Sequence, residues 1–454
     1  MNGKKNYTLQ FTILTALFFM WGFITSMNDV LIPHLKALYD LSYFESMMIQ
    51  FCFFGAYFIG SLIYFLLSHY KEDPINKIGY KNGMVLGLVV SAIGCLLFYP
   101  AASLHIYLLF LIALFIVGIG VTLLQIVGNP YISLLGTEKD ASSRLNLAQG
   151  FNSLGTTIAP VLGGFLIFKY FSNNGIISSE ATKVPYIIFA LVFLLLAFIV
   201  YRIEFPAFKS DDSEMEGLGA LKFPQLKLGA LGIFFYVGTE VTIGSFMISF
   251  LIEPQILGIS SVAAKDYLAL YWGGAMIGRF LGAISLNHRI PYLKKILYMV
   301  GTAILVFLLI LGIVNLSFSE ISVFLILIVL NLVGFLLGKS APARTLSLFA
   351  VVNVILVLLA ITNDGAFAMW ALLGVGLFNS IMWSNIFTLS IAGLGKYTSQ
   401  GSSLLVMAIL GGAIIPLIQG GLADAFGLQN SFYMPVLCYM YILFFGLFCW
   451  KKKI

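Results

Sequence analysis

Long apolar runs, separated by short polar connections, follow one another along almost the whole chain. A spanning helix needs about 20 mostly apolar residues, and fourteen runs reach that length. The pattern therefore predicts an all-α polytopic membrane protein with fourteen spans. They lie near residues 8–31, 44–68, 80–100, 104–135, 145–170, 184–203, 228–253, 264–287, 293–314, 319–338, 343–362, 366–393, 401–422 and 431–450.

Composition and charge agree with this pattern. Hydrophobic residues make up 60% of the 454 residues and charged residues only 10%, whereas soluble domains carry about 25% charged residues. With a cytoplasmic amino terminus, 21 of the 25 Lys and Arg residues, Arg279 among them, fall on the cytoplasmic side and 4 fall outside. Such a bias marks the cytoplasmic face. We therefore expect a multi-pass, monomeric protein of the cytoplasmic (inner) membrane, surrounded by lipid, with both termini in the cytoplasm. The net charge of +6 follows from the same bias and needs no nucleic-acid partner.

A weak internal repeat divides the chain. The motif FFxxG at Phe18 to Gly22 recurs at Phe234 to Gly238, an offset of 216. Transporters are often built from such repeats, and the later jump in offset leaves room for two added helices. We predict an N-terminal six-helix half at 1–203, a cytoplasmic interdomain loop at 204–227, and a C-terminal half at 228–454 with an extra helical hairpin at about 293–338. Four later matches share an offset of 256: Asn129 with Asn385, Gly155 with Gly411, Pro160 with Pro416, and Gly164 with Gly420.

Two carboxylates lie inside apolar runs. A charge at bilayer depth costs roughly 2.5 kcal/mol or more, so it persists where it faces a cavity, an ion or a substrate. Asp29 follows Asn28 near the outer end of the first span, and Glu240 has no basic residue near it in sequence. Both are candidates for binding a coupling ion, sodium or proton. The alternatives are a carboxylate at the membrane interface for Asp29 and a structural partner across the bundle for Glu240.

Amide side chains recur at helical spacing within other spans. Gln125 and Asn129 are four residues apart and precede Pro130, which frees a backbone carbonyl from the helix. Carboxamides offer donors and acceptors that suit sugar hydroxyls, and an aromatic ring can pack on the apolar face of a sugar. Hydrogen bonds between helices and an interfacial Trp are the competing interpretations. The substrate-binding candidates are Asn28, Gln125, Asn129, Gln149, Asn152, Asn379, Trp383 and Asn385.

No catalytic motif is present in the sequence. The four His residues show no metal-ligand spacing, and no Walker loop is found. We therefore expect neither an enzyme, nor a cofactor, nor a metal site beyond a sodium ion at Asp29 or Glu240. Energy must come from an ion gradient or from the substrate alone.

Several motifs resemble the major facilitator superfamily, specifically its fucose permease and glucose/galactose transporter family. They are FFMWG at 18–22, NDVLIPHL at 28–35, QIVGNPY at 125–131, RLNLAQGFNSLG at 144–155 and IFTLSIAGLGKYT at 386–398. The resemblance implies sugar uptake by symport, with alternating access between two six-helix halves. In the fucose branch, acidic residues on the first and fourth spans serve the proton and the sugar. Asp29 matches the first, but Gln125 stands where the second would be Glu. With Glu240, this looks more like the hexose branch, where sodium coupling is known.

We therefore expect a secondary active transporter that imports a hexose, glucose/galactose or similar, by cation-coupled symport. The alternatives are proton-coupled uptake of fucose or of another monosaccharide or amino sugar, and a multidrug efflux antiporter. A membrane enzyme or sensor would need a catalytic cluster or a sizeable soluble domain.

Overall fold

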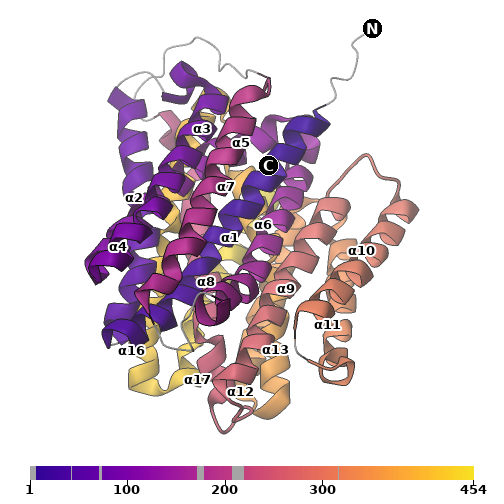
Figure 1. The fold of residues 1–454 in the computed structure, drawn as a ribbon. Coiled ribbons are helices and arrows are strands. Elements are labelled where there is room, and N and C mark those ends of the chain that lie inside the picture. The colour runs from indigo at the N-terminus through magenta and orange to yellow at the C-terminus, as the bar shows by residue number, and fades with distance from the viewer. Residues whose placement is uncertain (1–6, 42, 71–73, 171–177, 207–218, 315) are drawn as a thin grey trace. The chain divides into compact units, whose positions relative to one another are not determined.

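A computed structural model describes residues 7–41, 43–70, 74–170, 178–206, 219–314 and 316–454 (Figure 1). Within these ranges every regular element is helical, so the prediction of an all-α protein is confirmed. Residues 207–218, half of the interdomain loop predicted at 204–227, lie outside the described residues. The long helices are α1 (Thr8–Tyr39), α2 (Tyr43–Tyr70), α3 (Pro74–Leu96), α5 (Tyr107–Leu134), α6 (Ala141–Gly164), α7 (Lys183–Arg202), α8 (Pro224–Ile252), α9 (Ser261–Ser285), α10 (Tyr292–Ile313), α11 (Phe318–Gly338), α12 (Pro342–Thr362), α13 (Gly365–Asn379), α16 (Gly411–Phe426) and α18 (Tyr433–Lys452); the shorter ones are α4 (Phe98–Leu104), α14 (Met382–Ile391), α15 (Thr398–Met407) and α17 (Leu428–Ser431).

Twelve helical segments in the described part of the chain are long and apolar enough to cross a membrane. The predicted count of fourteen is therefore not confirmed. The spans predicted near 145–170 and 264–287 correspond to α6 and α9, which are 24 and 25 residues long but are not among the twelve. Charged and amide residues lower the hydropathy of α6, and Lys265, Asp266 and Arg279 lower that of α9.

The chain forms two compact units, which we describe separately. The first contains α1 to α5, the second part of α6 from Leu154, α7 and residues 393–407. In it, α3 packs on α5 and α7, and α2 packs on α5 and α15. Gly94 of α3 lies so close to α5 that an added Cβ would come within 2.5 Å of the Val117 nitrogen. Small residues at such crossings let spanning helices approach closely.

The second unit contains residues 136–153, with the first part of α6, then 223–392 and 408–454. Its packing repeats the pattern of the first unit: α12 lies against α13 and α18 as α3 lies against α5 and α7, and α9 lies against α13 as α2 lies against α5. In this comparison α10 and α11 have no counterpart. They stand next to each other beside α9 (Figure 1), at the place where the sequence predicts an added hairpin.

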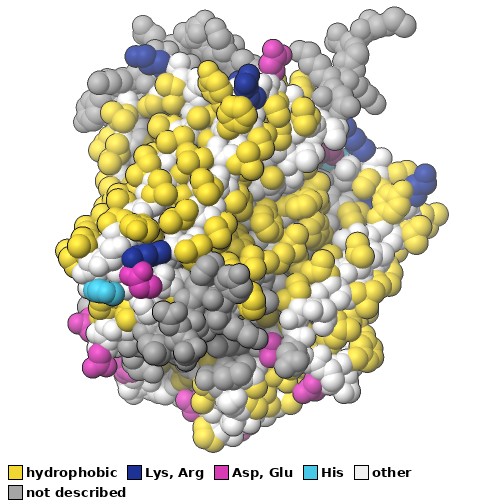
Figure 2. Space-filling model, viewed as in Figure 1, with side chains coloured by type: hydrophobic (Ala, Val, Ile, Leu, Met, Phe, Trp, Pro, Cys, Tyr) yellow, Lys and Arg dark blue, Asp and Glu magenta, His cyan; other side chains and the backbone are white. Residues whose placement is uncertain are grey.

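The outer surface of the hairpin is apolar. Leu297, Ile304, Leu305 and Leu308 of α10 are between 56% and 68% exposed, and hydrophobic side chains also dominate the visible face of the molecule (Figure 2). Apolar patches this extensive on a water-soluble protein would favour association. Hydrocarbon is therefore the surrounding that suits this surface.

Candidate polar site

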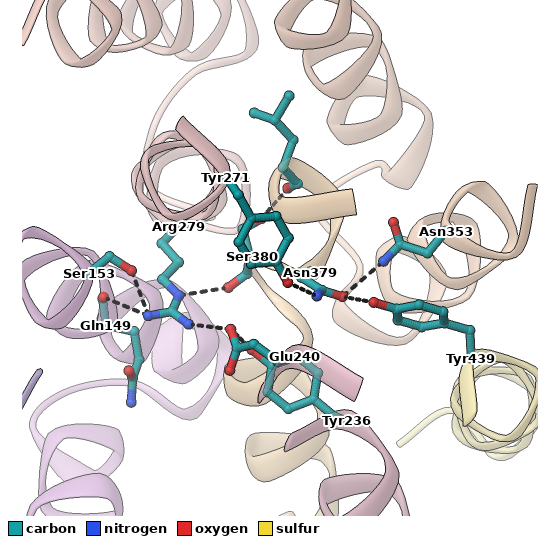
Figure 3. A network of polar contacts seen from close by, with 11 residues as sticks. Gln149, Ser153, Tyr236, Glu240, Tyr271, Arg279, Asn353, Asn379, Ser380 and Tyr439 are labelled. Atoms are coloured by element: carbon teal, nitrogen blue, oxygen red, sulfur yellow. Dashed lines mark hydrogen bonds and ion pairs between the residues drawn. The ribbon is translucent and has the colours of Figure 1, made fainter. Parts of the chain in front are cut away.

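A buried ion pair joins α8 and α9 in the second unit (Figure 3). The Arg279 Nη2 donates to Glu240 Oε1 over 3.1 Å, and the Tyr236 hydroxyl donates to the same oxygen over 2.7 Å. Only 7% of the Arg279 side chain and 14% of the Glu240 side chain are exposed. Glu240 therefore has a structural cation as its partner. The partner was not visible near it in sequence, because it comes from the next helix.

The same guanidinium makes three further hydrogen bonds. Its Nε donates to the Ser380 carbonyl over 3.2 Å, and Nη1 donates to Ser153 Oγ over 2.6 Å and to the Gln149 carbonyl over 3.3 Å. The planar fork of Arg suits such a set of fixed acceptors. Arg279 thus links α6, α8 and the end of α13. The sequence places Arg279 among the cytoplasmic charges, and the structure shows that its side chain is buried against neighbouring helices rather than exposed at a helix end.

Asn379 lies at the centre of a second group of contacts (Figure 3). Its Nδ2 donates to the Tyr271 hydroxyl over 3.2 Å, while its Oδ1 accepts from the Tyr439 hydroxyl over 2.6 Å and from Asn353 Nδ2 over 3.0 Å. Only 1% of Asn379 is exposed. Because both ends of its amide already have partners from other helices, Asn379 holds α9, α12, α13 and α18 together.

Asn385 and Trp383 lie in α14, directly after a break in the helix. α13 ends at Asn379 and α14 begins at Met382. Asn385 Nδ2 donates to the Pro342 carbonyl over 3.1 Å, and its Oδ1 accepts from Asn146 Nδ2 over 3.4 Å. The Trp383 ring stacks against Phe387, and its buried Nε1 has no hydrogen-bond partner among the described residues. Trp383 therefore has a donor atom without a partner among the described residues, whereas both polar atoms of Asn385 have one.

In the first unit, Gln125 and Asn129 share one face of α5. Asn129 is fully buried, and neither its Oδ1 nor its Nδ2 has a partner among the described residues. The Oε1 of Gln125 is likewise buried without a partner, although the Tyr57 hydroxyl interacts with the Gln125 side chain. A buried amide without partners costs about 1–3 kcal/mol per group. These two side chains therefore have hydrogen-bonding capacity that the described protein groups do not use.

Pro130 frees a backbone carbonyl of α5, as the sequence predicts. A proline in a helix leaves the carbonyl four residues earlier without its usual donor. That carbonyl belongs to Ile126, and the Ser402 Oγ of α15 donates to it over 3.4 Å. The irregularity in α5 is thus used to hold α15 in the first unit.

The remaining candidates, Gln149, Asn152, Asn28 and Asp29, differ in their hydrogen-bond partners. The Gln149 Nε2 is buried without a partner in the described part of the chain, whereas Asn152 has one. Asn28 is fully buried, its Nδ2 lies 3.5 Å from Gln50 Oε1, and its Oδ1 has no described partner. Asp29 lies in α1, but its side chain is outside the described part of the structure.

Sequence reasoning missed Arg279 and the phenols of Tyr236, Tyr271 and Tyr439. The signal for Arg279 was present: a single Arg in an otherwise apolar stretch, six residues before the end of α9. The phenols gave no such signal, because Tyr also occurs as an ordinary apolar residue in spanning helices.

The chain is a set of apolar helices that bury an Arg–Glu pair and amides with unused polar atoms, as expected of a membrane protein with a polar interior. It belongs to the Major Facilitator Superfamily, whose family model matches residues 14–345. The protein is accordingly a multi-pass membrane transporter and not an enzyme.

Relatives with known names show which members of the superfamily this chain is similar to. The chain is 43% identical over 450 residues to the glucose/galactose transporter of Brucella abortus, a match that covers 98% of this chain and 95% of the relative. It is 29% identical over 470 residues to the L-fucose-proton symporter of Escherichia coli, covering 98% and 94%. A crystal structure of the fucose symporter in an outward conformation matches with a TM-score of 0.75 and 29% identity, covering 98% of this chain and 99% of that one.

Proposed function

We propose that this protein is a proton-coupled symporter that imports a hexose, with glucose and galactose as the expected substrates. The relative named for these sugars supports the substrate class. The observation that carries the proposal is the set of buried amide and indole groups whose hydrogen-bonding capacity is unused, since a monosaccharide hydroxyl can both donate to them and accept from them.

The candidate residues divide into two roles in this proposal. Side chains with unused polar atoms contact the sugar, and those with saturated amides fix the helices that carry the contacts. Asn379 and Asn385 belong to the second group, because the Nδ2 and the Oδ1 of each already have a protein partner. The proposed sugar contacts are Asn28, Gln125, Asn129, Gln149 and Trp383, each of which has a buried polar atom without a partner among the described residues.

Coupling is assigned to a proton at Asp29, with Glu240 as the charge partner of Arg279. A guanidinium cannot lose its proton in a protein, and it already neutralises Glu240 at 3.1 Å. A sodium ion at Glu240 would have to compete with this fixed positive charge. Asp29 is therefore the better of the two carboxylates for the coupling cation, and the proton-coupled relative favours a proton over sodium.

The proposed topology has fourteen spans, with α6 and α9 crossing the membrane as well as the twelve apolar segments. Both are long enough to cross; Arg279 of α9 has its partners inside the bundle, and Gln149 of α6 is buried there too. Polar residues in spanning helices turn inward in this way. An even count gives both termini the same side, and the Lys and Arg bias of the sequence makes that side the cytoplasm. The proposed division is a six-helix half at 1–203 and a longer half at 228–454.

Transport would proceed by alternating access. Proton binding neutralises Asp29, which removes the penalty for carrying a bare carboxylate through a closed state. If the proton and the sugar each bind better in the presence of the other, the proton gradient drives sugar accumulation.

The test is counterflow of labelled sugars in proteoliposomes, with sodium concentration and pH varied separately. We expect glucose and galactose to exchange without sodium, and Asp29→Asn to retain exchange but lose accumulation driven by a pH gradient. Exchange of fucose but not of glucose or galactose would show that the substrate proposed here is wrong and that fucose takes its place. Unchanged accumulation by Asp29→Asn would remove Asp29 from coupling.

A further inference from the structure

The hairpin α10–α11 carries one buried amide within its apolar sequence. Asn331 lies in the middle of α11, on the face that also buries Phe324, Ile328 and Phe335. It is fully buried, and its Oδ1 has no hydrogen-bond partner among the described residues. An apolar residue would avoid this unsatisfied oxygen, so packing alone does not account for an amide at this position.

The other end of the amide reaches the break between α13 and α14. Asn331 Nδ2 donates to the Leu377 carbonyl over 3.1 Å, in the last turn of α13. The last four carbonyls of a helix have no partner within it. Two more side chains serve the same break: Ser380 Oγ donates to the Leu377 carbonyl over 2.6 Å, and Arg279 Nε donates to the Ser380 carbonyl over 3.2 Å.

The residues on either side of this break matter for the proposed site. Asn379 ends α13, and Trp383 lies in the first turn of α14. The direction in which α14 leaves the break therefore sets the position of the Trp383 ring and its free Nε1. A donor that fixes the Leu377 carbonyl also fixes where α13 ends.

We propose that Asn331 is a positioning residue, through which the hairpin α10–α11 braces the broken helix and so orients Trp383 toward the sugar. The inference rests on the proposed function, because Trp383 is a sugar contact only there. The hairpin then has a role beyond packing. It lies outside the repeated helices, and its Asn331 donates a hydrogen bond to the Leu377 carbonyl at the break.

The test compares Asn331→Leu with two control variants on the same helix. Leu keeps the branched shape and the number of heavy atoms of the side chain and removes both the donor and the acceptor. Ser322→Ala removes a hydroxyl that bonds only within α11, and Leu327→Ala weakens packing where Leu327 lies over Gly374 of α13. In counterflow we expect Asn331→Leu to raise the KM for the sugar about tenfold, the equivalent of about 1.4 kcal/mol, with Vmax within about twofold. Both controls should keep the wild-type KM, and Leu327→Ala should lower only the Tm.

A second readout does not depend on transport. The fluorescence of Trp383, obtained as the difference between each protein and its Trp383→Phe form, should shift in Asn331→Leu but not in Ser322→Ala. An unchanged KM with unchanged Trp383 emission would overturn the proposal, and so would an equal rise in KM for Leu327→Ala. If the wild type transports no sugar, the proposed function fails, while the emission still decides whether Asn331 positions Trp383.

Discussion

The Arg279–Glu240 pair gives the sharpest prediction about stability. Arg279→Gln would leave Glu240 as a buried carboxylate with the Tyr236 hydroxyl as its partner, and would also take a donor from the Ser380 carbonyl. Removing one partner of a buried ion pair costs about 3–5 kcal/mol. Glu240→Gln should cost less, about 1–3 kcal/mol, because three neutral acceptors from α6 and the end of α13 remain on the guanidinium.

The double variant separates the pair from its surroundings. With both charges replaced, no uncompensated charge stays buried, so the loss should be smaller than the sum of the two single losses by about 1–3 kcal/mol. The assay is equilibrium unfolding of the purified protein in mild detergent by added sodium dodecyl sulfate. Arg289→Gln is the matched control, because Arg289 pairs with Asp140 but is 63% exposed, and an exposed pair contributes about 0–1 kcal/mol. If the two single losses summed to the loss of the double variant within about 0.5 kcal/mol, the coupling between Arg279 and Glu240 would be refuted.

Three further predictions follow from individual contacts. Asn129→Leu should abolish sugar exchange yet raise unfolding stability by about 1–3 kcal/mol, because it removes two buried atoms without partners; a loss of both would show that Asn129 is a structural amide. Trp383→Phe, which removes the free Nε1 donor, should raise the KM about tenfold in counterflow with little change in Tm, and an unchanged KM would remove that donor from the site. Partial burial raises the pKa of Asp140, but hydrogen bonds from Thr137, from the His288 backbone and from Arg289 outweigh this and hold it below its ordinary value. The stability that Asp140 contributes is therefore present above its unfolded pKa of about 3.9 and is lost as the pH falls through the lower folded value. Asp140→Asn should remove this acid-side loss from a Tm-against-pH curve, and an unchanged acid limb would contradict the assignment.

The helices could be predicted from the sequence because apolar length decides them. Each predicted run corresponds to a helix or a pair of consecutive helices, and the freed carbonyl before Pro130 was expected from the chemistry of proline alone. The count of fourteen spans is not confirmed, because α6 and α9 fall outside the twelve apolar segments; both helices contact polar partners that lie far away in sequence.

The candidate site was less accessible from the sequence, for a physical reason. An amide in a spanning helix looks the same whether its partners are protein groups or a ligand. In Asn379 and Asn385 both the Nδ2 and the Oδ1 have protein partners, whereas Asn129 and the Trp383 Nε1 have none among the described residues. Helical spacing can place two residues on one face, as it did for Gln125 and Asn129, but it does not say what lies opposite that face.

Proton movement caused by added sugar would show directly whether hexose entry is coupled to protons. Proteoliposomes with no ion gradient and no sodium would be suspended in weakly buffered medium, and glucose or galactose would be added. We predict that the external medium becomes more alkaline as protons enter with the sugar, and that Asp29→Asn shows no such change. Sugar entry without any proton movement, or entry that begins only when sodium is added, would contradict proton-coupled hexose transport.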